Sequence, residues 1–111
     1  MVDLELDDLK REFLAEADEK VREIQTKLDG EPSPEALERL TYLAHQLKGS
    51  GGSYGFSRIS TDAAELETAV EQLAREGTTR GIDDRIQQHV FSLRSEVDRR
   101  MKEFAVEVAR T

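Results

Sequence analysis

The spacing of apolar residues constrains the fold of this chain more than any other feature. In four segments, apolar side chains recur at intervals of three and four residues, which places them on one face of a helix. None of the segments alternates with the period of two that marks a half-buried strand. The sequence therefore predicts an all-α fold in which each helix buries one stripe. The stripes are Phe13, Ala17, Val21, Ile24 and Leu28; Leu37, Leu40, Ala44 and Leu47; Ile59, Ala63, Leu66, Val70 and Leu73; and Ile82, Ile86, Val90, Leu93, Val97, Met101, Phe104 and Val108.

Glycine and proline stand where the stripes are interrupted. Gly30 follows the first stripe and Gly77 the third, and glycine readily adopts the left-handed conformation that ends a helix. Ser33 before Pro34 is a start signal, with serine as N-cap and proline in the first turn. Four helices with short connections favour an antiparallel up-down-up-down bundle. Leu4 precedes the first stripe and leaves room for a short extra N-terminal helix.

Length and charge limit the classes of function. A chain of 111 residues fits one domain, which we expect to span residues 1–111. The net charge of -8 would repel a nucleic-acid backbone, so nucleic acid is not an expected partner. The chain has no cysteine, which excludes disulfides and thiolate metal sites.

The uninterrupted runs of apolar residues bear on whether the chain crosses a membrane. They extend over only a few residues, far short of the about 20 that a membrane-spanning helix needs. The first five residues include two acids, Asp3 and Glu5, and no base, which is the opposite of the start of a signal peptide. We therefore expect a cytoplasmic protein without a membrane partner, and a monomer is the default.

Two histidines offer candidate reactive groups, and their settings differ. At about 100° per residue, His45 lies about 130° from the centre of the apolar stripe in its helix and faces solvent. Thr41, Lys48 and Gly52 share that face. His89 adjoins a stripe residue of the last helix and has no special neighbourhood in the sequence.

Glycines crowd the residues that follow His45. A glycine inside a helix costs about 0.5–1 kcal/mol relative to alanine, so four within seven residues need an explanation. Three explanations are open: a long glycine loop, close packing of two helices, or clearance beside His45 for another protein. A phosphate-binding P-loop is excluded, because the lysine precedes the glycines and no strand leads into them. The four are Gly49, Gly51, Gly52 and Gly55.

The chemistry of these residue types favours clearance. A neutral imidazole is a competent nucleophile towards phosphorus near pH 7. Lys48, one helical turn from His45, can supply a positive charge to a phosphoryl group on the ring. A metal or haem site that uses His45 and His89 is a poor alternative, since neither has partner ligands at convincing spacing.

These features resemble a known signature. Residues 45–56, HQLKGSGGSYGF, are similar to the motif of histidine-containing phosphotransfer (HPt) domains: His, any residue, an aliphatic, Lys, Gly, five residues, Gly. The resemblance implies that His45 is phosphorylated, that Lys48 lies near the phosphoryl group and that Gly49 opens space for docking. Gly55 matches the glycine that closes the motif near the turn between two helices.

The run from Gly49 to Phe56 most resembles the HPt domains of chemotaxis-type histidine kinases. In those domains a glutamate on the following helix hydrogen-bonds the histidine, and the resemblance assigns that role to Glu67. A carboxylate that accepts the Nδ1 proton would leave Nε2 free as the nucleophile. The alternative is that Glu67 belongs, with Glu65 and Glu71, to an ordinary charged helix face.

The resemblance implies a phosphohistidine carrier in a two-component phosphorelay. His45 would accept a phosphoryl group from a histidine-kinase catalytic domain or a receiver, and pass it to a receiver aspartate. The chain would have no nucleotide site of its own, as a free-standing carrier or as part of a larger kinase, and Mg²⁺ would come from the partner. The alternative function is a helical interaction module that is not phosphorylated. The docking residues expected around His45 are Thr41, Tyr42, Gly49, Gly52 and Arg58.

Overall fold

The computed structural model describes residues 2–31, 33–77 and 80–110, with side chains for residues 6–31, 33–77 and 81–104. Four helices account for nearly all of these residues, and the described part of the chain contains no strand. This confirms the predicted all-α fold. The helices are α1 (Val2–Asp29), α2 (Pro34–Ser53), α3 (Ser57–Glu76) and α4 (Arg80–Arg110).

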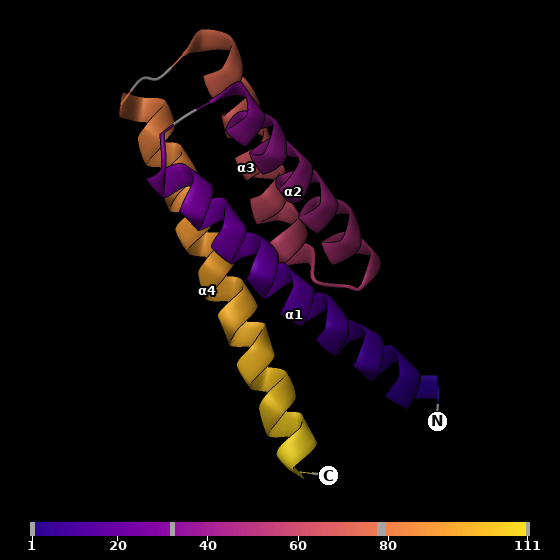
Figure 1. The fold of residues 1–111 in the computed structure, drawn as a ribbon. Helices are drawn as coiled ribbons and strands as arrows, with labels where there is room; N and C mark the ends of the chain where they lie inside the picture. Colours follow the sequence, from indigo (N-terminus) through magenta and orange to yellow (C-terminus); the bar gives the residue numbers. More distant parts are fainter. Residues whose placement is uncertain (1, 32, 78–79, 111) are drawn as a thin grey trace.

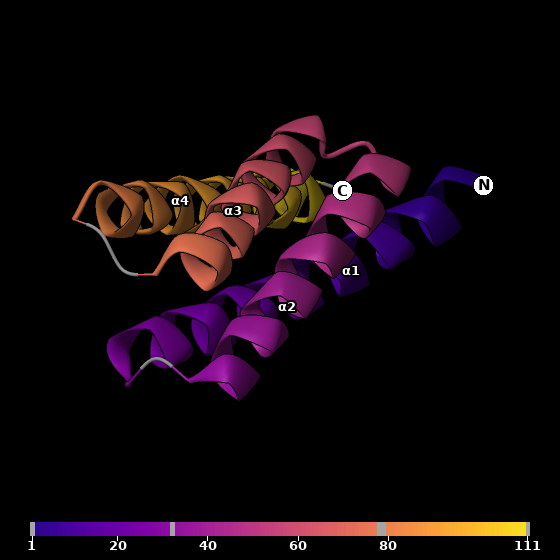
Figure 2. The ribbon, with the colours of Figure 1, turned by 90° about the horizontal axis from the view of Figure 1, so that it is seen from above.

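The helices form an antiparallel bundle in which sequence neighbours are also neighbours in space (Figures 1 and 2). Contacts join α1 to α2, α2 to α3, α3 to α4 and α4 to α1, most extensively between α2 and α3. Within the described residues, the diagonal pairs have no Cα atoms within 8 Å of each other, so α2 lies diagonally opposite α4. The bundle measures 50 × 19 × 19 Å, and α1 and α4 extend beyond the α2–α3 turn (Figure 1).

The first helix departs from expectation at its start. We allowed for a short extra N-terminal helix, but α1 is one continuous helix of 28 residues from Val2. No glycine or proline interrupts residues 2–29, and charged residues that are tolerated in a helix fill its exposed face. The chain therefore has no local reason to break between Leu4 and the first stripe.

The predicted stripes form the core. The side chains of Ala17, Ile24, Leu47, Leu66 and Leu93 are completely buried, and every other stripe residue with a described side chain is buried or packs against them. Burying one such aliphatic side chain contributes about 1.5–3 kcal/mol, so the stripes hold the four helices together. The core adds residues that the stripes did not include: Leu14, Leu43, Phe56 and Ala69. None of the described helices contains a segment both long enough and apolar enough to cross a bilayer.

The turns between helices follow most of the local signals, although Gly30 after α1 does not adopt the left-handed conformation that Gly77 after α3 does, with φ = 80°. The Ser33 side chain accepts a hydrogen bond from the backbone N–H of Ala36 at 3.1 Å, which caps α2 as predicted. Gly55 in the α2–α3 turn has φ = 83°, a left-handed conformation that favours glycine. The backbone N–H of Phe56 then donates to the carbonyl of Gly51 at 2.8 Å, which closes the turn.

Aromatic side chains fix this turn against the rest of the bundle. The Phe13 ring of α1 lies 5.4 Å from the Tyr54 ring and 5.5 Å from the Phe56 ring, between centroids. The Phe104 ring of α4 lies 6.2 Å from Phe56, and the Arg100 guanidinium lies 5.0 Å from the centre of the same ring. Aromatic pairs at such distances contribute about 0.5–1.5 kcal/mol beyond burial. The end of the α2–α3 hairpin is therefore held by both outer helices.

Candidate functional site

His45 lies on the exposed face of α2, as its helical phase predicts. Its side chain is 66% exposed, while Leu43, Ala44 and Leu47 on the same two turns are buried. The imidazole is therefore displayed at the surface by a backbone that the core holds in place.

Glu67 of α3 connects His45 to Lys48. One carboxylate oxygen lies 2.9 Å from His45 Nδ1, and the other accepts a hydrogen bond from Lys48 Nζ at 2.9 Å. The Glu67 side chain is only 13% exposed, so the carboxylate sits between the two helices. The expected contact between Glu67 and His45 is present.

Electrostatics determine which nitrogen of the ring carries the proton. Burial favours the neutral acid of Glu67, but the hydrogen bonds from Lys48 and His45 outweigh it and hold the pKa of Glu67 below its usual range. The carboxylate is therefore ionised near pH 7 and can only accept hydrogen bonds. Nδ1 of His45 must then be the donor, which leaves the lone pair of Nε2 directed away from Glu67.

Both the side chain and the backbone of Lys48 are bound by residues of α3. Its side chain is 39% exposed and paired with Glu67, and its carbonyl accepts a hydrogen bond from the Ser60 hydroxyl at 2.7 Å. These two contacts tie the same turn of α2 to α3. The ammonium group is positioned one helical turn from the imidazole, with its remaining donors available.

The glycine cluster divides into different roles. The loop explanation is wrong for Gly49, Gly51 and Gly52, because α2 continues through all three to Ser53. A Cβ at Gly51 would lie 3.1 Å from the backbone nitrogen of Ser60, so the close packing of α2 on α3 favours glycine here. A Cβ at Gly49 would have no neighbour within 4 Å, so packing does not explain it. Of the three explanations, the open space at Gly49 leaves clearance beside His45, which stays a prediction.

The other expected docking residues are spread around His45. Thr41 lies one turn before it, with the hydroxyl donating to the Leu37 carbonyl at 3.0 Å. Tyr42 is 49% exposed, and its hydroxyl accepts a hydrogen bond from Gln46 at 2.6 Å. Gly52 is exposed two turns beyond His45. Arg58 is exposed in the first turn of α3. Among the described side chains it forms no hydrogen bond or ion pair with the His45 group, by which we mean His45, Lys48 and Glu67.

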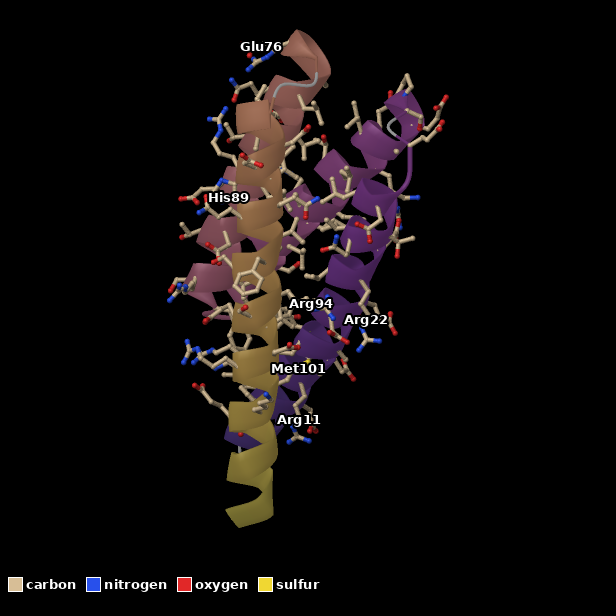
Figure 3. All side chains as sticks on the ribbon, turned by 90° about the vertical axis from the view of Figure 1, so that its left-hand side faces the viewer. Arg11, Arg22, Glu76, His89, Arg94 and Met101 are labelled. Carbon is tan, nitrogen blue, oxygen red and sulfur yellow. The ribbon has the colours of Figure 1, made fainter. Side chains whose placement is uncertain are left out.

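The expectation that His89 has no special neighbourhood is wrong. His89 lies on α4 (Figure 3). Its Nδ1 lies 3.3 Å from a carboxylate oxygen of Glu65 on α3. The sequence gives little warning of this pair, since 24 residues separate the two and both lie among ordinary helix-surface residues. Among the described residues, no three histidine, cysteine or carboxylate side chains are grouped so that they could hold a metal ion.

A groove beside His45 was not foreseen from the sequence. We call it the α2–α3 groove. It has a volume of about 650 Å³ and begins one helical turn from the imidazole, at Thr41. The sequence feature that relates to this groove is Leu37. It belongs to the apolar stripe of α2, but its side chain is only partly buried. The groove is lined by Pro34, Leu37, Glu38 and Thr41 of α2 and by Glu71, Ala74 and Arg75 of α3.

Comparison with known proteins agrees with this geometry. The family model described as Hpt domain matches residues 8–103 of the chain. Among curated proteins and solved structures, none matches. The matched span includes the described parts of all four helices that form the core, together with His45, Lys48 and Glu67. The chain therefore belongs to the Hpt domain family.

Proposed function

We propose that this protein carries a phosphoryl group on Nε2 of His45 within a two-component phosphorelay. Domains of this family generally carry phosphohistidine. The observation that carries the proposal is the arrangement of the imidazole, with Nδ1 2.9 Å from the ionised Glu67 and the ring 66% exposed. This arrangement leaves a nucleophilic nitrogen facing an approaching protein.

The chemistry consists of two displacements at phosphorus, one that loads His45 and one that unloads it. The Nε2 lone pair attacks the phosphorus of a donor in line, the Nε2–P bond forms, and the bond from phosphorus to the donor atom breaks. The Nδ1 proton remains in its hydrogen bond to Glu67, whose negative charge stabilises the positive imidazolium ring of the product. A receiver aspartate oxygen then attacks phosphorus, and cleavage of the Nε2–P bond restores the neutral ring.

Lys48 supplies positive charge to the same reaction. Its ammonium group can keep its bond to Glu67 or turn towards the phosphoryl oxygens, since it carries three donors on a flexible stem. The phosphoryl group is close to a dianion near pH 7, so a nearby ammonium stabilises it. The same chemistry gives Glu67 a positioning role and Lys48 a role in charge neutralisation.

The partners would supply the rest of the catalysis. Phosphoryl transfer depends on alignment and charge neutralisation, which a receiver or a kinase catalytic domain provides with bound Mg²⁺. In this proposal the chain is a substrate and carrier for both partners, and its own contribution is a rigid, exposed and correctly protonated imidazole.

The test is to follow the phosphoryl group. We expect labelled phosphate to appear on the protein after incubation with a phosphorylated receiver or a histidine-kinase catalytic domain with ATP, and to map to His45 by mass spectrometry. The label should be acid-labile and base-stable, absent in His45→Gln and formed more slowly in Lys48→Ala. A folded protein that no donor in a broad panel labels would contradict the proposal and favour an interaction module without phosphoryl chemistry.

A further inference from the structure

We propose that the α2–α3 groove is where the receiver domain docks, and that it takes an apolar side chain flanked by lysine or arginine. This inference rests on the proposed function, since it assigns a surface to the partner that removes the phosphoryl group from His45. It adds residues that lie outside the reacting group: Leu37, Glu38, Glu71 and Ala74.

The groove is lined by apolar and by acidic side chains, and we call Pro34, Leu37 and Ala74 its floor and Glu38 and Glu71 its rim. Pro34, Leu37 and Ala74 present apolar surface from both helices, and Pro34 and Ala74 are exposed. Glu38 and Glu71 line the groove from opposite helices, and both are exposed. A concave apolar floor with a few polar groups around it is typical of sites that bind an anchoring side chain.

The position of the groove places it under any protein that reaches His45. A standard interface covers about 800 Å² of each partner, a patch with a radius of about 16 Å. At about 1.5 Å per residue, Thr41 lies about 6 Å along α2 from His45 and Pro34 about 16 Å. In the other direction α2 ends at Ser53, only about 12 Å away. A receiver centred on His45 therefore covers the groove.

The charges at the rim select the partner. Glu38 and Glu71 are exposed, and neither forms an ion pair among the described residues, whereas Glu67 is bound to both His45 and Lys48. Arg75 lies one turn beyond Glu71, farther from His45. The rim nearest the imidazole is thus negative and unneutralised, and the chain as a whole carries a net charge of -8. Basic residues on the partner complement this surface and accelerate its approach.

Two substitutions test the floor and the rim separately. Ala74→Gln fills the groove without adding charge, and Glu38→Lys reverses one rim charge without touching the His45 group. Ala15→Gln and Glu16→Lys make the same changes at exposed positions of α1 and serve as matched controls. Each variant is loaded on His45 with phosphoramidate, a small donor that needs no docking, and then mixed with increasing concentrations of a receiver that accepts phosphate from the wild type.

We expect both groove variants to load normally and to require at least about fivefold more receiver for half-maximal transfer, with little change in the maximal rate. Glu38→Lys should also weaken the dependence of transfer on salt. The two α1 controls should match the wild type.

Three results would overturn the inference. If the groove variants stay within twofold of their controls while the wild type transfers normally, the groove is not used and the proposed function stands. If, in a parallel assay with a histidine-kinase catalytic domain and ATP as the donor, the groove variants are loaded more slowly while delivery to the receiver is unchanged, the groove belongs to the kinase. If the wild type transfers to no receiver, the proposed function fails, and the groove has no receiver to bind.

Discussion

At the scale of single residues, the two histidines of this chain pair with carboxylates in opposite arrangements. His45 is 66% exposed and its partner Glu67 only 13%, whereas His89 is 23% exposed and its partner Glu65 53%. In the first pair the carboxylate is held inside and the ring is presented outside. In the second pair the ring is partly covered and the carboxylate is solvated, which weakens the pairing. Only the first arrangement offers Nε2 to a protein partner.

Replacing Glu67 should reveal its positioning role. In Glu67→Gln the amide cannot favour the Nδ1–H tautomer as a carboxylate does, so we expect transfer through His45 to fall by about 10-fold to 100-fold. His45 should remain the labelled residue. Glu65→Gln removes the carboxylate from the other pair and should transfer at the wild-type rate. Equal rates in the two variants would show that Glu67 does not position the ring.

The same substitution should change how stability depends on pH. Because the folded-state pKa of Glu67 lies below its unfolded value, the carboxylate stabilises the protein fully above about pH 4.3 and progressively less as pH falls through the folded value. We expect Glu67→Gln to lower the free energy of unfolding by about 1–2 kcal/mol at pH 7, since both partners are partly solvated. Urea unfolding should show that this difference shrinks below about pH 4. A difference that grows towards low pH would contradict the assignment.

Gly49 allows stability and function to be separated. It lies inside α2 with open space where a Cβ would be, so Gly49→Ala should raise the free energy of unfolding by about 0.5–1 kcal/mol. The added methyl group stands beside the imidazole, and we expect transfer to a receiver to become slower. Gly81→Ala, in open space on α4, should stabilise the protein without slowing transfer. If Gly49→Ala transfers at the wild-type rate, clearance is not the reason for this glycine.

At the scale of the helices, the site depends on how closely α2 and α3 approach each other. Gly51 is buried against the backbone of α3 where that helix begins, one turn from Lys48. The Ser60 hydroxyl bonds the Lys48 carbonyl across the same contact at 2.7 Å. This close approach brings Glu67 of α3 within hydrogen-bond distance of His45 on α2. The glycine therefore acts on the site through the spacing of the helices.

A larger side chain at Gly51 should force the two helices apart. We expect Gly51→Leu to lower the free energy of unfolding by about 1–3 kcal/mol, because the obstructing atoms include backbone of α3 that cannot move alone. Gly52→Leu is the matched control, since a Cβ there meets only the Ser60 hydroxyl at an ordinary 3.5 Å. Chemical denaturation of both variants measures the difference. Equal stabilities would mean that α2 and α3 can separate at little cost.

At the scale of the whole molecule, the bundle separates reactive and structural faces. α2 carries His45 and lies diagonally opposite α4, so that α4 can support α3 from the side away from the imidazole. One polar contact marks this support: the Ser92 hydroxyl of α4 donates to the buried carboxyl group of Asp62 on α3 at 2.9 Å. The rotation of α3, and with it the direction of Glu67, is constrained from behind.

Removing that contact should destabilise the bundle. Ser92→Ala leaves the buried Asp62 without its donor, and we expect the free energy of unfolding to fall by about 1–3 kcal/mol. Ser95→Ala, an exposed position on the same helix, should change it by less than about 0.5 kcal/mol. Thermal or urea unfolding distinguishes the two. If Ser92→Ala lowers the free energy of unfolding by less than about 0.5 kcal/mol, the contact does not stabilise the folded state.

The sequence by itself determined the four helices, the N-cap of α2 and the outward direction of His45. These properties follow from spacing and residue type within one segment: the Leu40, Ala44 and Leu47 stripe fixes which side of α2 is buried, and Ser33 and Gly55 mark its ends. Local periodicity is enough for them, because a helix has the same geometry wherever it packs.

Apart from the Glu67–His45 contact, which the resemblance predicted, the tertiary structure decided which residues meet across helices. At about 100° per residue Glu65 and Glu67 point to opposite sides of α3, and the family resemblance assigned Glu67 to His45. The packing of α3 shows the partners of all three glutamates: Glu67 meets His45, Glu65 meets His89 and Glu71 lines the α2–α3 groove. It likewise separated Gly51, where the packing favours glycine, from Gly49, where it does not. The physical reason is that the rotation of one helix against another is set by the fit of both surfaces, which no pattern within one segment contains.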